Sequence, residues 1–199
     1  MTIIIVLFLV FSYLFGSIPT GYILFLLSEK KDIRSYGSKA TGATNVLRVK
    51  GWKYGIIVAI FDILKGFLPV FLALKFLPDK NFALVCGFLA IVGHCYPVYI
   101  KFKGGKGVAT TIGAYAAVSI YPLLISLAIF IAIVIITRYV SLASVTTAFC
   151  YPVCAYILKD PLQIVYFSLL VFFLILFQHR ENIFRLIKGQ ERKLGEKTK

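Results

Sequence analysis

The chain of 199 residues is too apolar for a water-soluble globular protein, since 60% of its residues are hydrophobic and 15% are charged, whereas roughly half are apolar in soluble domains. Its mean hydropathy is +0.90. The formal net charge of +14 is typical of nucleic-acid-binding proteins, but the basic residues fall between apolar runs, which indicates membrane topology and excludes a nucleic-acid partner. The composition therefore predicts an all-α integral membrane protein.

Apolar runs long enough for much or all of a bilayer crossing of ~20 residues recur along the chain. They predict seven transmembrane helices in a single membrane domain, residues 1–199. No Lys or Arg precedes the first run, so we expect an uncleaved span there and not a signal peptide. The predicted spans lie near residues 2–27, 54–77, 82–100, 108–121, 122–137, 140–158 and 161–178.

The stretch 108–137 is short for two crossings and long for one. A single crossing would place the basic C-terminal tail on the opposite side of the membrane from the basic segment 30–53, against the preference of Lys and Arg for the cytoplasmic side. Two short passes that turn at Tyr121–Pro122 place both basic segments inside, and proline disfavours a straight helix. We therefore predict an outside N-terminus and a cytoplasmic C-terminus.

The first of three polar segments on the predicted cytoplasmic side is 35–48, which is dense in glycine, hydroxyl and basic side chains. Glycine permits sharp turns, hydroxyl and amide groups can contact an anion, and an arginine fork suits phosphate. We interpret the segment as a phosphate-binding loop; the alternative is a solvated basic turn with helix caps. Its candidate site residues are Ser38, Thr44, Asn45 and Arg48.

The second polar segment, 93–110, joins the end of one predicted span to a glycine loop and the start of the next span. Successive glycines let backbone N–H groups approach an anion, a lysine adds a point charge, and the positive end of the helix beginning near Val108 faces the same place. Gly107 stands where a Walker A loop needs Ser or Thr, so we expect no nucleotide hydrolysis. The candidate residues are His94, Gly104, Gly105, Lys106 and Gly107.

The third polar segment, 178–192, directly follows the last predicted span. His179, Arg180 and Asn182 are its candidate site residues, because they are polar and lie at the same predicted membrane face as the other two segments. The alternative is an interfacial amphipathic helix that only contacts anionic lipid. Within the second span, Asp62 and Lys65 are three residues apart, which predicts an ion pair inside the bilayer that supports the site.

Five motifs occur in order along most of the chain: Gly16–Pro19; Gly37–Ser38 with Gly42–Arg48; Gly93–Pro97 leading to Phe102–Thr110; Val140–Ser144; and His179–Leu186. Together they resemble the acyl phosphate:glycerol-3-phosphate acyltransferase family of bacterial membranes, the PlsY type. Two positions depart from the family pattern. Ala40 stands where Asn is common, and Gln178 stands where Arg is frequent.

The resemblance implies that the 1-hydroxyl of sn-glycerol 3-phosphate attacks the carbonyl of a long-chain acyl phosphate, giving lysophosphatidic acid and phosphate. It implies a site on the cytoplasmic face of the bacterial inner membrane, and we expect a monomer among membrane lipids with no cofactor or metal. The phosphate-binding role falls to Lys106, the glycine loop, Thr44 and Asn45. Arg48 and Asn182 would bind the acceptor, and Ser38 and Ser141 would orient the reacting groups.

The proton acceptor stays open at this stage between His179, His94 and the substrate's own phosphate. Two other functions fit basic segments on the predicted cytoplasmic side: a transporter of organic phosphate and a lipid-binding structural protein. A soluble-type acyl-CoA acyltransferase is set aside, because neither histidine has Asp five residues on. All these assignments depend on the expectation that the three polar segments gather into one pocket at the inner leaflet.

Overall fold

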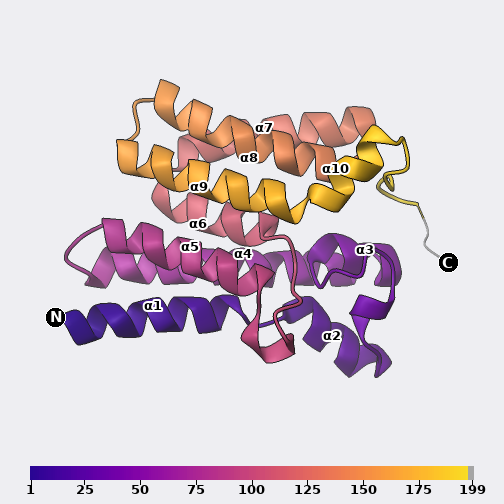
Figure 1. The fold of residues 1–199 in the computed structure, drawn as a ribbon, viewed down its shortest axis with the longest axis horizontal. Coiled ribbons are helices and arrows are strands. Elements are labelled where there is room, and N and C mark those ends of the chain that lie inside the picture. The colour runs from indigo at the N-terminus through magenta and orange to yellow at the C-terminus, as the bar shows by residue number, and fades with distance from the viewer. Residues whose placement is uncertain (197–199) are drawn as a thin grey trace. The chain divides into compact units, whose positions relative to one another are not determined.

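The structure is a computed structural model that describes residues 1–196. Every regular element in this range is helical, which confirms the predicted all-α class (Figure 1). The elements are α1 (Thr2–Gly16), α2 (Thr20–Glu29), the 3-10 turn η1 (Ile33–Ser35), α3 (Ala43–Lys50), α4 (Trp52–Phe76), α5 (Asn81–Cys95), the 3-10 turn η2 (Val98–Ile100), α6 (Val108–Val118), α7 (Ile120–Thr137), α8 (Val140–Ile157), α9 (Leu162–Gln178) and α10 (Arg180–Ile187).

The described residues fall into two compact units. The first, unit 1, contains Met1–Ala117, and the second, unit 2, contains Val118–Glu196. Both lie within the stretch predicted as a single membrane domain, and that assignment stays a prediction. Each unit is described by itself below.

Unit 1 is built around α4 and α5, which pack against each other and against α1 (Figure 1). The smaller helices α2 and α3 also pack on α4. Small residues let these backbones approach closely, as membrane helices require. A Cβ on Gly93 would lie 2.4 Å from the Tyr13 carbonyl oxygen, and one on Gly113 would lie 1.9 Å from the Ile63 carbonyl oxygen. Glycine at these two positions therefore brings α5 against α1 and α6 against α4.

Unit 2 is a row of three long helices in which α8 packs between α7 and α9. After α9 the chain bends by 61° into α10, which contacts α8 and α9. The chain beyond α10 returns to the turn between α7 and α8, where the backbone N–H of Leu194 donates to the Arg138 carbonyl at 2.7 Å. The Arg138 guanidinium donates back to the Leu194 carbonyl at 2.7 Å. Unit 2 thus holds its own tail in place.

The side chains are distributed as in a protein whose solvent is lipid. Large apolar side chains are exposed along the long helices, including Ile135 at 74% and Ile136 at 79%. The interior of unit 1, by contrast, buries the charged pair Asp62 and Lys65, at 1% and 4% exposure. Water would penalise so much exposed apolar surface, whereas the hydrocarbon core of a bilayer does not.

Five helical segments in the described chain are long and apolar enough to cross a membrane. A sixth crossing arises if the bent pair of α9 and α10 counts as one. Helix α6 is apolar but has 11 residues, which at 1.5 Å per residue gives about 16 Å, well short of the ~30 Å hydrocarbon core. Seven complete crossings and the predicted orientation of the termini stay predictions.

Two helix breaks differ from the predicted span boundaries. The first span, expected as one helix over 2–27, is interrupted at residues 17–19, where Pro19 is the N-cap of α2. The break expected at Pro122 lies instead at Ser119. Pro122 therefore falls in the first turn of α7, where backbone N–H groups have no intrahelical partner and proline costs little.

Candidate substrate site

The first polar segment is less of a loop than predicted, because its second half forms helix α3 after an N-cap at Gly42. Asn45 is 1% exposed on this helix. Its side-chain oxygen accepts the Ser38 N–H at 2.7 Å, and its amide nitrogen donates to the carbonyls of Tyr36 at 3.1 Å and Ala40 at 2.8 Å. Asn45 therefore ties the turn around Ser38 to α3, and its contact with phosphate stays a prediction.

The departure at Ala40 has a structural explanation in the same turn. Position 40 contributes its backbone carbonyl to Asn45, and any residue supplies that group equally well. Thr44 and Arg48 lie four residues apart on α3, so they share one helix face. Their predicted role in binding a phosphorylated substrate remains compatible with this placement.

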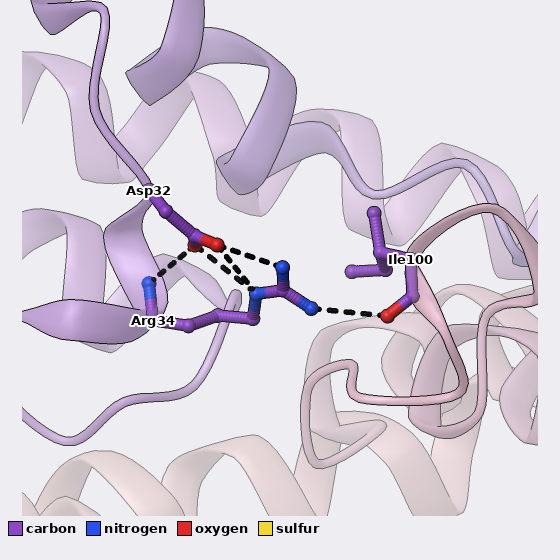
Figure 2. Close-up of polar contacts among 3 residues, drawn as sticks. All are labelled: Asp32, Arg34 and Ile100. Carbon is purple, nitrogen blue, oxygen red and sulfur yellow. Dashed lines mark hydrogen bonds and ion pairs between the residues drawn. The ribbon is translucent and has the colours of Figure 1, made fainter.

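Arg34, directly before the first polar segment, contacts the second polar segment at Ile100, as Figure 2 shows. Its guanidinium donates to both carboxylate oxygens of Asp32, with the shortest contact at 2.7 Å, and its Nη1 donates to the Ile100 carbonyl at 3.0 Å. The hydrogen bonds from Arg34 hold the pKa of the Asp32 carboxyl below its usual value. Neither residue was predicted to matter, since both read as ordinary charges in a basic loop.

The chain that follows Ile100 turns sharply into the glycine loop. Lys101 and Phe102 both adopt left-handed backbone conformations, with φ of 59°, which costs a non-glycine residue of order 1 kcal/mol. The Phe102 N–H donates to the Pro97 carbonyl at 2.9 Å. The Arg34 contact with the Ile100 carbonyl braces the start of this strained turn.

Two of the loop's backbone N–H groups make contacts that the anion-binding hypothesis did not predict. Gly104 N–H donates to the Cys95 carbonyl at 3.2 Å, and Gly105 N–H donates to the His94 carbonyl at 3.1 Å. These donors fasten the loop to the end of α5. Lys106 is half-buried beyond them, and Gly107, with φ of 83°, leads into α6.

His94 lies beside the predicted ion pair, which is confirmed. Lys65 Nζ is 2.8 Å from Asp62 Oδ1, 2.7 Å from the Ile18 carbonyl and 3.3 Å from His94 Nδ1. Since an ammonium only donates, Nδ1 of His94 is the acceptor, and the neutral ring carries its proton on Nε2. Asp62 Oδ1, at 3.7 Å from Nδ1, is beyond hydrogen-bond distance.

Unit 2 brings two other candidates, Ser141 and Asn182, to a shared partner that sequence reasoning missed. Ser141 Oγ and Asn182 Nδ2 both donate to Glu191 Oε1, at 2.9 and 2.7 Å, while Arg185 Nε donates to Oε2 at 2.8 Å. Burial alone would raise the pKa of Glu191, but the hydrogen bonds from Asn182, Arg185 and Ser141 outweigh it, and the pKa lies below its ordinary value. Glu191, which lies in the C-terminal tail, thereby orients the side chains of Ser141 and Asn182.

His179 occupies the bend between α9 and α10 and is 3% exposed. Its Nδ1 lies 2.8 Å from the Ile175 carbonyl, which can only accept, so Nδ1 carries a proton, and in the neutral ring the lone pair is on Nε2. Arg180, in contrast, is exposed; it stacks on Phe177 at 4.5 Å and donates to the Phe177 carbonyl at 3.0 Å. Its predicted substrate contact stays a prediction.

Within unit 1, Arg34 links the chain just before the first polar segment to Ile100, ahead of the glycine loop, and within unit 2 Glu191 joins Ser141 to Asn182. The predicted convergence of the Lys106 and His179 segments concerns both units and stays a prediction. In residues 1–196, no three or more His, Cys, Asp or Glu side chains are grouped as metal ligands.

A family model described as glycerol-3-phosphate acyltransferase matches residues 6–189. The chain belongs to the glycerol-3-phosphate acyltransferase family. Curated members include a protein of Thermoanaerobacter pseudethanolicus strain ATCC 33223 / 39E, 44% identical over 95% of each chain. Another, from Staphylococcus aureus strain Newman, is 42% identical over 96% of this chain and 98% of its own.

Solved structures agree with this membership. The crystal structure of PlsY, an integral membrane glycerol 3-phosphate acyltransferase, in its glycerol 3-phosphate form is similar to this chain at a TM-score of 0.92 and 40% identity, over 96% of each chain. The lysophosphatidic acid form matches at a TM-score of 0.88 and 39% identity, over 96% of this chain and 95% of that one. The resemblance seen in the motifs is thereby confirmed, and the chain is an integral membrane glycerol-3-phosphate acyltransferase.

Proposed function

We propose that the enzyme transfers a fatty acyl group from acyl phosphate to the 1-hydroxyl of sn-glycerol 3-phosphate, giving 1-acyl-glycerol 3-phosphate and inorganic phosphate. The observation that carries this proposal is the whole-chain similarity to a PlsY structure in its glycerol 3-phosphate form. The related lysophosphatidic acid form supports the product. The reaction belongs to the bacterial inner membrane, with the site facing the cytoplasm, where the basic segments 30–53 and 178–192 are expected.

The chemistry suits a protein that binds and orients without a cofactor. Acyl phosphate is an activated mixed anhydride, so its leaving group needs little protonation. The main requirement is to hold two phosphorylated substrates close together, since two dianions a few ångströms apart repel by several kcal/mol even at an effective dielectric of ~20. Lys106 and Arg48 are the cations assigned to this task, and Ser38 orients the reacting groups beside them.

The hydrogen bonds of Ser141 and His179 support their proposed roles in acyl transfer. The Ser141 hydroxyl proton is directed at Glu191, which leaves its oxygen to accept a hydrogen bond from a substrate hydroxyl. In the neutral His179 ring, the Nδ1 contact with the Ile175 carbonyl leaves the lone pair on Nε2, and this supports His179 as the proposed general base among the two histidines. The acceptor's own phosphate is the competing base.

Replacing His179 with Gln tests this assignment. General-base catalysis contributes about 100-fold or more, so kcat should fall by at least that factor while both KM values change little. His94→Gln serves as the comparison, with a smaller expected loss in kcat. A loss of less than about tenfold in His179→Gln would assign the proton to the substrate phosphate.

The donor is tested by offering purified protein palmitoyl phosphate, palmitoyl-CoA or palmitoylated acyl carrier protein in turn, each with labelled glycerol 3-phosphate. Mass spectrometry of the lipid product identifies the acylated position. We expect lysophosphatidic acid to form only when palmitoyl phosphate is the acyl donor. Product formed only from the thioesters would contradict the proposed donor.

A further inference from the structure

Unit 1 buries two ionised side chains, Asp62 and Lys65, in the middle of an apolar helix. Charges inside a membrane protein are costly and face a functional cavity or a partner. Both residues lie on α4 at 4% exposure or less, and neither belongs to the motifs assigned to substrates. Replacing a buried ion pair by well-packed apolar residues is often neutral or stabilising, so cohesion alone does not account for this pair.

The Lys65 ammonium lies among three groups: it hydrogen-bonds to two of them and forms an ion pair with the third, Asp62. They are Asp62 Oδ1 at 2.8 Å, the Ile18 carbonyl at 2.7 Å and His94 Nδ1 at 3.3 Å. The Ile18 carbonyl belongs to the break between α1 and α2. One ammonium thus connects α4 to that break and to the end of α5.

The His94 ring transmits this arrangement to the glycine loop. A Cβ on Gly105 would lie 2.1 Å from His94 Nε2, so the loop backbone lies directly against the Nε2 edge of the ring. The Gly105 N–H also donates to the His94 carbonyl at 3.1 Å. A Cβ on Gly104 would lie 2.2 Å from that same carbonyl oxygen. The loop is therefore fitted to both the ring and the backbone of one residue.

We propose that Asp62, Lys65 and His94 form a positioning unit for the 104–107 loop, in which the buried ammonium fixes the ring of His94 and the ring fixes the loop backbone. The acceptor role of Nδ1 directs the Nε2 proton toward the loop side. His94 is then a positioning residue and not a base. The inference rests on the proposed function only in taking the loop and its Lys106 to bind a phosphorylated substrate.

The test removes both charges together, because removing one would leave the other buried without a partner. In Asp62→Leu/Lys65→Met, backbone hydrogen exchange of the peptide covering 103–107 should become at least about tenfold faster. The KM for one of the two phosphorylated substrates should rise about tenfold, with kcat changed less than about threefold. Lys75→Met, an exposed change at the end of the same helix, is the matched control and should leave exchange and KM unaltered.

A pair of His94 variants tests the ring itself with both charges in place. The amide of Gln can place an N–H near the position of Nε2, whereas Leu cannot. We expect loop exchange in His94→Gln to stay close to wild type and in His94→Leu to increase about tenfold. If the double variant fails to fold, this pair decides the question.

Unchanged loop exchange in both the double variant and His94→Leu would overturn the positioning unit. So would a fall in kcat with both KM values unchanged, since the cluster would then act on the chemical step. Loop exchange does not depend on turnover. If the wild-type protein catalysed no acyl transfer, the proposed function would be refuted. The hydrogen-exchange rates of the loop would still test the positioning unit.

Discussion

Glu191 joins three polar side chains of the candidate site in unit 2. It is 7% exposed, and its carboxylate accepts hydrogen bonds from a serine, an asparagine and an arginine on different turns and helices. Hydrogen bonds to a charged group contribute roughly 1.5–3 kcal/mol each when buried, and a donor left without its partner costs more than the bond itself was worth. A tail residue thereby sets the orientation of Ser141 and Asn182.

Glu191→Gln keeps the size of the side chain and removes its charge. We expect the loss of about 2 kcal/mol, which for a protein of this length lowers Tm by roughly 4–8 °C, together with reduced activity because Ser141 and Asn182 lose their orientation. Thermal unfolding in detergent measures the change. Glu196→Gln, at an exposed position whose carboxylate accepts the Lys193 N–H at 3.0 Å, is the control, and equal Tm values for the two variants would refute the role of Glu191.

The lowered pKa of Glu191 also predicts a pH dependence. A carboxyl whose pKa is lower in the folded state stabilises the fold fully above its unfolded pKa of about 4.3, and this stabilisation is lost as pH falls through the folded value. Asp32 acts in the same direction. We expect Tm to fall between about pH 5 and 3, and to fall less in Glu191→Gln. An identical pH profile for wild type and variant would exclude Glu191 as a contributor.

Sequence reasoning found Ser141 and Asn182 but not the carboxylate that joins them. Both belong to motifs of the resembled family, whereas Glu191 lies 50 residues beyond Ser141 and nine beyond Asn182. No local periodicity links the three. Glu191 is one of three acids in a strongly basic tail, with Glu181 and Glu196, so its charge did not single it out in the sequence.

At the scale of elements, side-chain hydrogen bonds join short segments of unit 1. The Arg34 contact with Ile100 joins η1 to η2, and Asn45 joins α3 to the turn before it. Hydropathy indicates where long helices run, but it does not detect such links. It also missed the break at residues 17–19, because the apolar run continues through Ile18.

Arg34→Gln should loosen the brace between η1 and η2. Arg34 and Asp32 are partly exposed, with side-chain exposures of 26% and 35%, so solvent screening limits the loss to roughly 1 kcal/mol, or about 2–4 °C in Tm. Activity should fall further, because the strained turn at Lys101 loses its support. Lys31→Gln removes the same charge from an exposed neighbouring position, and a matching effect there would show that charge alone is responsible.

At the scale of the whole molecule, composition alone predicted the all-α membrane class, because lipid as solvent requires apolar surfaces on helices. Motif order predicted the family, and both are confirmed. The division into two units could not be read from the sequence, since it depends on which helices pack together. The buried pair Asp62 and Lys65 is an exception, because its spacing on one helix predicted the contact directly.

The most direct measurement of the central claim is lysophosphatidic acid formation from palmitoyl phosphate and glycerol 3-phosphate by purified wild-type and Lys106→Ala protein. Loss of a cation that stabilises phosphate costs roughly 3–4 kcal/mol, so we expect robust product from wild type and a rate reduced at least about 100-fold in the variant. Near-normal turnover by a folded Lys106→Ala protein would contradict the account, as would a wild-type protein that forms no product.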